Sequence, residues 1–189
     1  MTKKSRKTPV IRLFLMLLIL AAAGYAGYRI LHIEKAGRNA DAVLDVMYDL
    51  IPGLGKETDI STGAGKDPML TLSINDIDIV GCLEIPSIGL MVPVTVAGEE
   101  YEGFLTFISG SPVKGKLMLE GDRTTTLSKL SEAQPGDKVV FTDIEGIRYS
   151  YRVLTQFNLK DWDKADQALM ICYRVDEQTR FVLGCTRAE

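Results

Sequence analysis

An uncharged apolar run near the N-terminus constrains this chain more than any other feature. No charged residue lies between Leu13 and Tyr28, and neighbouring apolar residues bring the run close to the roughly 20 residues that cross a bilayer as a helix. The N-terminal side of the run carries basic residues, which are Lys3, Lys4, Arg6, Lys7 and Arg12. By the positive-inside rule, this pattern predicts a cytoplasmic tail over residues 1–12, a transmembrane helix over 13–31 and an extracytoplasmic remainder.

A cleaved signal peptide is the alternative interpretation of the same run. The small residues Ala21, Ala22 and Ala23 offer a cleavage site after a short apolar core. A retained anchor accounts for more of the pattern, because the apolar run continues past these alanines and because Tyr25 and Tyr28 suit the membrane interface. We therefore predict a single-pass protein of the cell membrane, in contact with membrane lipid.

The charge outside the predicted anchor argues against a nucleic-acid partner. The whole chain has a formal net charge of −3. From Asn39 onward it holds 14 basic and 24 acidic side chains, so this part carries about −10. Nucleic-acid-binding surfaces need clustered lysine and arginine. An acidic outer domain predicts partners of another kind.

Cysteine and histidine usage predicts neither a disulfide framework nor a bound metal or cofactor. Three cysteines are too few for a disulfide-rich fold, and an odd number cannot all be paired. A single disulfide between Cys82 and Cys185, on neighbouring predicted strands, is an open alternative. No Cys-x-x-Cys pair occurs, and the single histidine, His32, lies at the predicted membrane boundary. Three acidic residues that could suggest calcium flank turns, where acidic residues are common: Asp137, Asp143 and Glu145.

The segment after the predicted anchor, residues 32–68, divides into a helix and a linker. Glu34 to Leu50 has apolar residues at helical spacing before the stop signal Pro52-Gly53. This predicts an amphipathic helix that forms a stalk or caps the folded domain. Gly53 to Pro68 is rich in glycine and polar residues, which predicts a flexible linker. The folded domain is then expected over residues 69–189.

Beyond the linker, short β-branched runs alternate with turn residues. They predict strands over residues 79–85, 90–96, 116–120, 138–142, 147–155, 168–173 and 180–185. Residues 125–133 predict a short helix, and residues 161–166 a polar loop or helical turn that contains Trp162. The predicted fold class is mainly all-β: a closed β-barrel of seven to eight strands with short helices, preceded by the N-terminal transmembrane helix.

One of these runs carries a family resemblance. Val80 to Val94 (VGCLEIPSIGLMVPV) resembles the opening strands of sortases, a family of cysteine transpeptidases, and is similar to their classes B and D. Gln134 to Asp143 (QPGDKVVFTD) and Tyr149 to Val153 (YSYRV) resemble later blocks of the same family. The similarity extends from about Ile79 to the end of the chain. It implies a sortase-like barrel outside the membrane with an N-terminal anchor.

The resemblance also implies roles for residues of the active site. Cys172 corresponds to the nucleophile, although Ile171 replaces the threonine that usually precedes it. Arg180 corresponds to the arginine that orients the substrate and stabilises the oxyanion. Asp122 occupies the place of the catalytic histidine. Cys185 also ends a strand-like run, but only four residues follow it, too few for another strand bearing the arginine.

The missing histidine changes what such a site can do. A sortase, as the resemblance implies, cleaves a Leu-Pro-x-Thr-Gly-like sorting signal through a thioester and passes the acyl group to an amine, and its histidine serves the proton transfers. A carboxylate at Asp122 raises the pKa of a neighbouring thiol and, when ionised, has no proton for the leaving amine. We expect Asp122 to pair with Arg180 or Arg123. Glu120, on the same strand face as Asp122, is expected to be a solvated strand-end charge.

Three functions therefore remain open. The first is a membrane-anchored sortase-like protein of the surface-protein or pilus sorting machinery, impaired in transpeptidation because Asp122 replaces the histidine. The second is an active transpeptidase that forms a thioester on Cys172 by another proton-transfer route. The third is a non-enzymatic extracytoplasmic binding or assembly module. For the first two, the resemblance implies two partners: a sorting-signal peptide of surface proteins or pilins, and an amine acceptor of the cell wall or a pilin.

Overall fold

The fold is described from a computed structural model. It covers residues 7–55, 65–98, 101–122, 125–159, 167–175 and 179–188. Most of the predicted linker, the predicted loop over 161–166 with Trp162, and Arg123 lie outside these residues. The chain divides into two compact units, residues 1–35 and residues 36–189.

A long helix, α1 (Lys7–Leu50), takes up the N-terminal part of the chain. Leucine, alanine and methionine dominate its first half, and these are strong helix formers. The helix ends just before Pro52, as predicted. Among the residues that the structure describes, no helical segment is both long enough and apolar enough to span a membrane.

The last turns of α1 belong to the second compact unit and pack on the barrel. Ala40, Val43, Leu44 and Met47 are buried in a cluster with residues of the first two strands, at the three- and four-residue spacing of one helix face. The predicted amphipathic helix is therefore a domain-capping element. Two of its predicted apolar positions, Tyr48 and Leu50, are exposed instead; the Tyr48 hydroxyl lies 2.8 Å from the sulfur of Met91.

In the described part of the chain, nine strands follow α1. They are β1 (Leu72–Ile74), β2 (Ile77–Ile85), β3 (Leu90–Thr95), β4 (Leu105–Ser111), β5 (Lys116–Gly121), β6 (Lys138–Asp143), β7 (Arg148–Leu159), β8 (Leu169–Arg174) and β9 (Arg180–Arg187). Short helices are η1 (Pro86–Ile88), α2 (Thr125–Ser128) and η2 (Lys129–Glu132). All seven predicted strands exist, and the helix predicted over residues 125–133 is α2 followed by η2.

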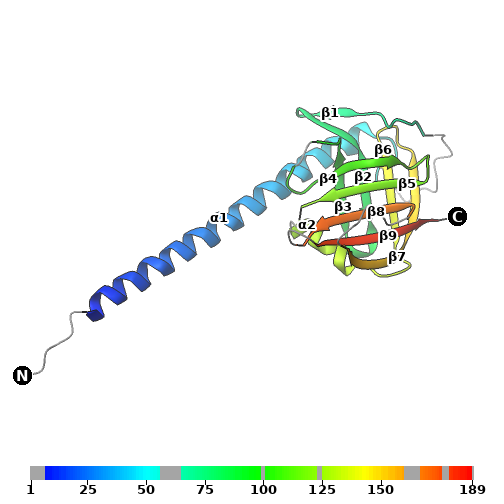
Figure 1. The fold of residues 1–189 in the computed structure, drawn as a ribbon. Coiled ribbons are helices and arrows are strands. Elements are labelled where there is room, and N and C mark those ends of the chain that lie inside the picture. Colours follow the sequence, from blue (N-terminus) through cyan, green and yellow to red (C-terminus); the bar gives the residue numbers. More distant parts are fainter. Residues whose placement is uncertain are drawn as a thin grey trace, which may run out of the picture. The chain divides into compact units, whose positions relative to one another are not determined.

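The strands form a closed barrel of eight, with β1 as an extra strand beside β2 (Figure 1). The sheet order is β1-β2-β3-β4-β5-β8-β9-β7-β6, and pairing of β2 with β6 closes it. Two neighbouring pairs, β3–β4 and β5–β8, are parallel, while the others are antiparallel. The prediction of a mainly β, closed barrel of seven to eight strands is confirmed.

The barrel interior is filled by alternate residues of the strands. Leu83, Leu119, Phe141, Ile171 and Leu183 are fully buried there. Because successive side chains of a strand point to opposite faces, the residues on either side of these positions point outward. This alternation decides which side chains of β5, β8 and β9 can form a site on the outer face.

Candidate functional site

Pairing across five adjacent strands brings sequence-distant residues into one row on the outer face of the barrel. Thr106 of β4 pairs with Glu120 of β5, and Glu120 pairs with Cys172 of β8. Cys172 pairs with Val182 of β9, which pairs with Phe157 of β7. Paired residues share a face of a sheet, so the predicted nucleophile lies directly beside a glutamate.

Cys172 is enclosed in this row. Its side chain is 1% exposed and belongs to a small apolar cluster with Met170 and Val182, against which Phe157 packs. Its thiol donates a hydrogen bond to the Leu119 carbonyl at 3.4 Å. Burial, followed by the Glu120 carboxylate, raises the pKa of Cys172 to about 12, against a smaller lowering by Arg180. At neutral pH the group is therefore an almost fully protonated thiol.

Arg180 opens β9 and contacts Glu120. Its Nε donates to Glu120 Oε1 at 2.8 Å, and the two side chains are 24% and 20% exposed. A charge-assisted bond of this length in a partly enclosed place is among the stronger hydrogen bonds in proteins. The sequence predicted that Asp122 pairs with Arg180 or Arg123 and that Glu120 is solvated. The structure places Glu120, partly enclosed, in contact with Arg180.

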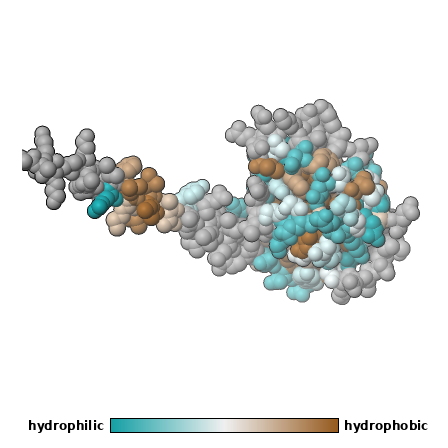
Figure 2. Space-filling view, turned by 90° about the horizontal axis from the view of Figure 1, so that it is seen from below, coloured by the Kyte–Doolittle hydropathy of each residue, from teal (hydrophilic) through white to brown (hydrophobic). Residues whose placement is uncertain are grey.

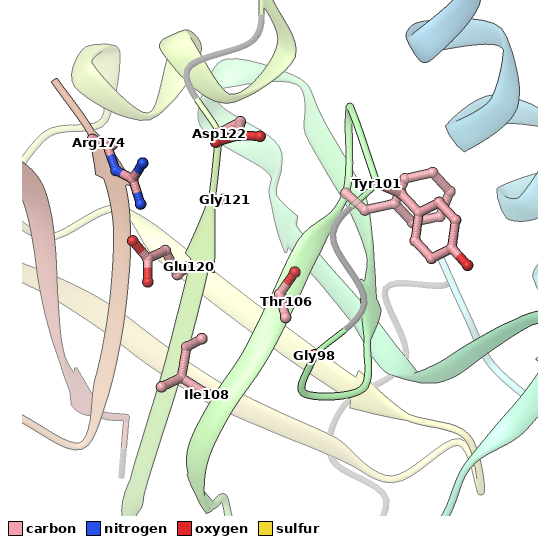
Figure 3. Close-up of a pocket in the computed structure, with 9 residues that line it drawn as sticks. Gly98, Tyr101, Thr106, Ile108, Glu120, Gly121, Asp122 and Arg174 are labelled. Carbon is pink, nitrogen blue, oxygen red and sulfur yellow. The ribbon is translucent and has the colours of Figure 1, made fainter. Parts of the chain in front are cut away.

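Asp122 is exposed just beyond the end of β5 and borders a pocket of about 80 Å³. The pocket is lined by Gly98, Tyr101, Phe104, Thr106, Ile108, Glu120, Gly121, Asp122 and Arg174. Figure 3 shows Asp122 at the strand end, the Arg174 guanidinium directed toward Glu120, and Tyr101 on the opposite side. Cys172 and Arg180 are not among the described residues that line it. Glu120 thus links the pocket to the cysteine and arginine.

The three predicted site residues consequently share one region of the outer face, but they are not equivalent. Cys172 and Arg180 meet through Glu120, whereas Asp122 lies two residues further along the chain, just past β5, and lines the pocket with Arg174. The sequence predicted Glu120 as a solvated strand-end charge and gave it no role in the site. Its sequence signal was its position two residues before Asp122, but only the parallel register of β5 with β8 places it beside the sulfur.

The other two cysteines are remote from this face. Cys185 is fully buried in the barrel core, and Cys82 lies in the cluster under α1. All three thiols are free, and β2 and β9 are not paired strands, so the structure contains no bridge between Cys82 and Cys185. Burial raises the pKa of Cys185 to about 12 and raises that of Cys82 as well. Of the two cysteines considered as nucleophile, Cys172 alone points away from the core.

The acidic residues considered for calcium have a local structural role where the structure describes them. Asp143 accepts hydrogen bonds from the backbone N–H groups of Glu145 and Ile147, at 3.0 and 2.9 Å. These bonds close the turn between β6 and β7. Asp137 likewise accepts a bond from the backbone of Gln134 at 2.8 Å.

Comparison with known proteins supports the fold. No protein-family model matches the chain, and no curated protein matches it significantly. Among solved structures it is similar to sortase A of Listeria monocytogenes, with a TM-score of 0.51 and 18% identity over 59% of this chain and 88% of that one.

Two further structures extend the comparison. Sortase A of Corynebacterium diphtheriae matches with a TM-score of 0.52 and 13% identity over 89% of this chain and 96% of that one. Sortase E1 of Streptomyces coelicolor was solved with a tripeptide in its active site. It matches with a TM-score of 0.50 and 14% identity over 59% of this chain and 88% of that one. At these identities the comparison defines a sortase-like β-barrel fold. The resemblance read from the strand motifs therefore holds at the level of the fold.

Proposed function

We propose that this chain is a membrane-anchored, sortase-like protein of the surface-protein or pilus sorting machinery that binds sorting-signal peptides without transferring them. The observation that carries the proposal is the 2.8 Å contact between Arg180 and Glu120 beside a buried Cys172. Thioester chemistry needs a thiolate, a proton donor for the leaving amine and an oxyanion partner. This arrangement weakens the thiolate and the oxyanion partner, and Asp122 at the histidine position weakens the proton donor.

The thiolate and the oxyanion partner are both affected by Glu120. A carboxylate beside Cys172 disfavours a second negative charge on the sulfur. The same carboxylate engages the guanidinium that, by the family resemblance, would stabilise the oxyanion. The proton donor is affected by Asp122, because an ionised carboxylate at the histidine position has no proton to give.

The outer face of the barrel has a pocket beside Glu120 that supports peptide binding. The pocket has a volume of about 80 Å³ and an apolar wall formed by Tyr101, Phe104 and Ile108. Its polar groups are Thr106, Glu120, Asp122 and Arg174. Pockets that combine apolar walls with a few placed polar groups are typical of ligand sites. The tripeptide in the active site of the similar Streptomyces sortase supports a peptide as the ligand class.

The membrane anchor of the proposal rests on the first half of α1. Side chains of residues 14–20 are all apolar and between 53% and 66% exposed, and Figure 2 shows this stretch as a mostly hydrophobic surface. A helix that is apolar all round needs to be buried in lipid or protein. Together with the five basic residues before it, this supports a bilayer anchor with the N-terminus in the cytoplasm.

The proposal is tested with the full-length protein in detergent or nanodiscs. A fluorescent Leu-Pro-x-Thr-Gly peptide and a scrambled control are titrated by fluorescence polarisation, and acylation is followed by intact-protein mass spectrometry. We expect saturable binding of the sorting peptide alone, with no mass increase and with unchanged affinity in Cys172→Ala. A thioester adduct on wild-type Cys172 would establish the active transpeptidase instead. Equal or absent binding of both peptides would reject the sorting signal as ligand.

A further inference from the structure

Glu120 lies where one carboxylate can act on both remaining candidate groups of the site. Its strand register places it against Cys172 of β8, and its Oε1 accepts a hydrogen bond from Arg180 Nε of β9, the next strand, at 2.8 Å. The thiol of Cys172 is in turn bonded to the carbonyl of Leu119, the residue before Glu120. The strand β5 thereby holds both the sulfur and, through Glu120, the guanidinium.

We infer that Glu120 is a latch: its carboxylate binds the Arg180 guanidinium and so withholds it from any ligand oxyanion, and it adds a negative charge beside the sulfur of Cys172. This inference deepens the proposed function and rests on it. Glu120 is a positioning residue here, since it acts through Arg180 and Cys172. It follows that the aspartate in the histidine's place is only one of two separate blocks in the site.

The surrounding charges favour this position for the latch. Arg174 and Arg180 are opposite each other in the pairing of β8 with β9, and like charges in such a pair repel. Glu120 projects toward both, by contact with Arg180 and by the direction of Arg174 in Figure 3. Asp122 borders the pocket at the exposed end of β5, so its charge is screened by solvent. Glu120 is therefore the partly enclosed carboxylate in contact with Arg180, whereas Asp122 is exposed.

The chain offers a matched control for the latch. Glu84 and Arg148 form a second partly buried ion pair at 3.5 Å, and Glu84 lies near another buried thiol, that of Cys82. Glu84→Gln removes an acid of the same type from a different face of the domain. It reports how much a lost ion pair loosens the fold in general, without touching the Glu120 site.

The experiment measures alkylation of each cysteine by iodoacetamide in the folded, full-length protein at pH 7.5, with peptide mapping by mass spectrometry. Glu120→Gln is expected to label Cys172 about tenfold faster than wild type, the equivalent of one pKa unit. Its pH–rate profile is expected to shift to lower pH by the same amount. Glu120→Asp, which keeps the charge, is expected to return the rate toward the wild-type value.

The outcomes separate a latch from a purely structural role. An unchanged Cys172 rate in Glu120→Gln overturns the inference. The inference is also overturned if Glu84→Gln accelerates labelling of Cys172 as much as Glu120→Gln does. It is overturned as well if Glu120→Gln accelerates labelling of Cys82 and Cys185 as much as that of Cys172. Both results indicate general loosening of the fold. The proposed function fails on a different measurement. If the sorting peptide does not bind, the alkylation rates of the Glu120 variants still test the latch. If those rates do not change, peptide binding still tests the proposed function.

Discussion

Raising the pH tests how strongly the fold holds Cys172 as a thiol. Its pKa of about 12 stands against about 8.5 for a free cysteine. At pH 7.5 the folded thiolate fraction is then about 3 × 10⁻⁵, compared with roughly 10% for an unfolded chain. Since the thiolate is the species that reacts with iodoacetamide, the folded rate constant is expected to be about 3,000-fold below that of the urea-unfolded protein.

The assay follows alkylation of Cys172 in folded and unfolded protein between pH 7 and 10. The folded rate constant is expected to rise about tenfold per pH unit without a plateau, because the whole range lies below the folded pKa. The unfolded rate constant is expected to level off above about pH 9. A folded profile that levels off below pH 9, or a folded rate within tenfold of the unfolded one at pH 7.5, would refute the reasoning.

The same pKa values predict how stability depends on pH. A thiol whose folded pKa is raised keeps its proton where the unfolded chain loses it, so its contribution to stability is complete below about pH 8.5 and is lost as the pH rises toward 12. Each buried thiol then lowers the free energy of unfolding by about 1.4 kcal/mol per pH unit within that window. Urea unfolding at pH 7.5, 9 and 10 measures the slope, and a midpoint independent of pH would contradict it.

Three further predictions concern the site and the core. Asp122→His alone is expected to give less acyl-thioester with a sorting peptide than the double variant Glu120→Ala/Asp122→His, because in the single variant Glu120 still holds the guanidinium. Intact-protein mass spectrometry measures both yields, and equal yields would count against the latch. Met47→Ala is expected to lower the free energy of unfolding by about 2–4 kcal/mol, because Met47 is fully buried between α1 and the barrel, while the half-exposed Val46→Ala serves as a near-neutral control in urea titrations. Tyr151→Phe is expected to leave stability unchanged or raise it by about 1 kcal/mol, because its buried hydroxyl has no hydrogen-bond partner among the described residues; a loss above 1 kcal/mol would reveal a partner.

Local patterns were sufficient to predict most of the barrel. Alternating β-branched residues and turn residues are signals that a single strand carries in its own sequence, and they located seven strands. The two strands that were missed have weak local signals: β1 is three residues long, and β4 ends in Ser109-Gly110-Ser111. Their pairing is imposed by neighbours, since β1 adds to β2 and β4 to β5.

The candidate site was predictable in its members but not in its contacts. Motif resemblance assigned Cys172 and Arg180, and both lie on the outer face of one sheet. Asp122 was expected to pair with Arg180, and the residue that contacts Arg180 in the structure is Glu120, two residues earlier in the chain. A sequence does not state which of two acidic residues on a strand end will be enclosed, because enclosure depends on the strands and loops that come to lie beside it.

By itself, the sequence determined a basic tail before an apolar run, an acidic β-rich domain and a cysteine followed by an arginine; the family resemblance added the expectation of an acid where a histidine would stand. The tertiary structure alone decided which acid faces the sulfur. β5 and β8 are parallel strands separated by more than 45 residues of chain, and their register pairs Glu120 with Cys172. Such a long-range register is fixed by packing of the whole barrel core, so no local stretch of sequence contains it.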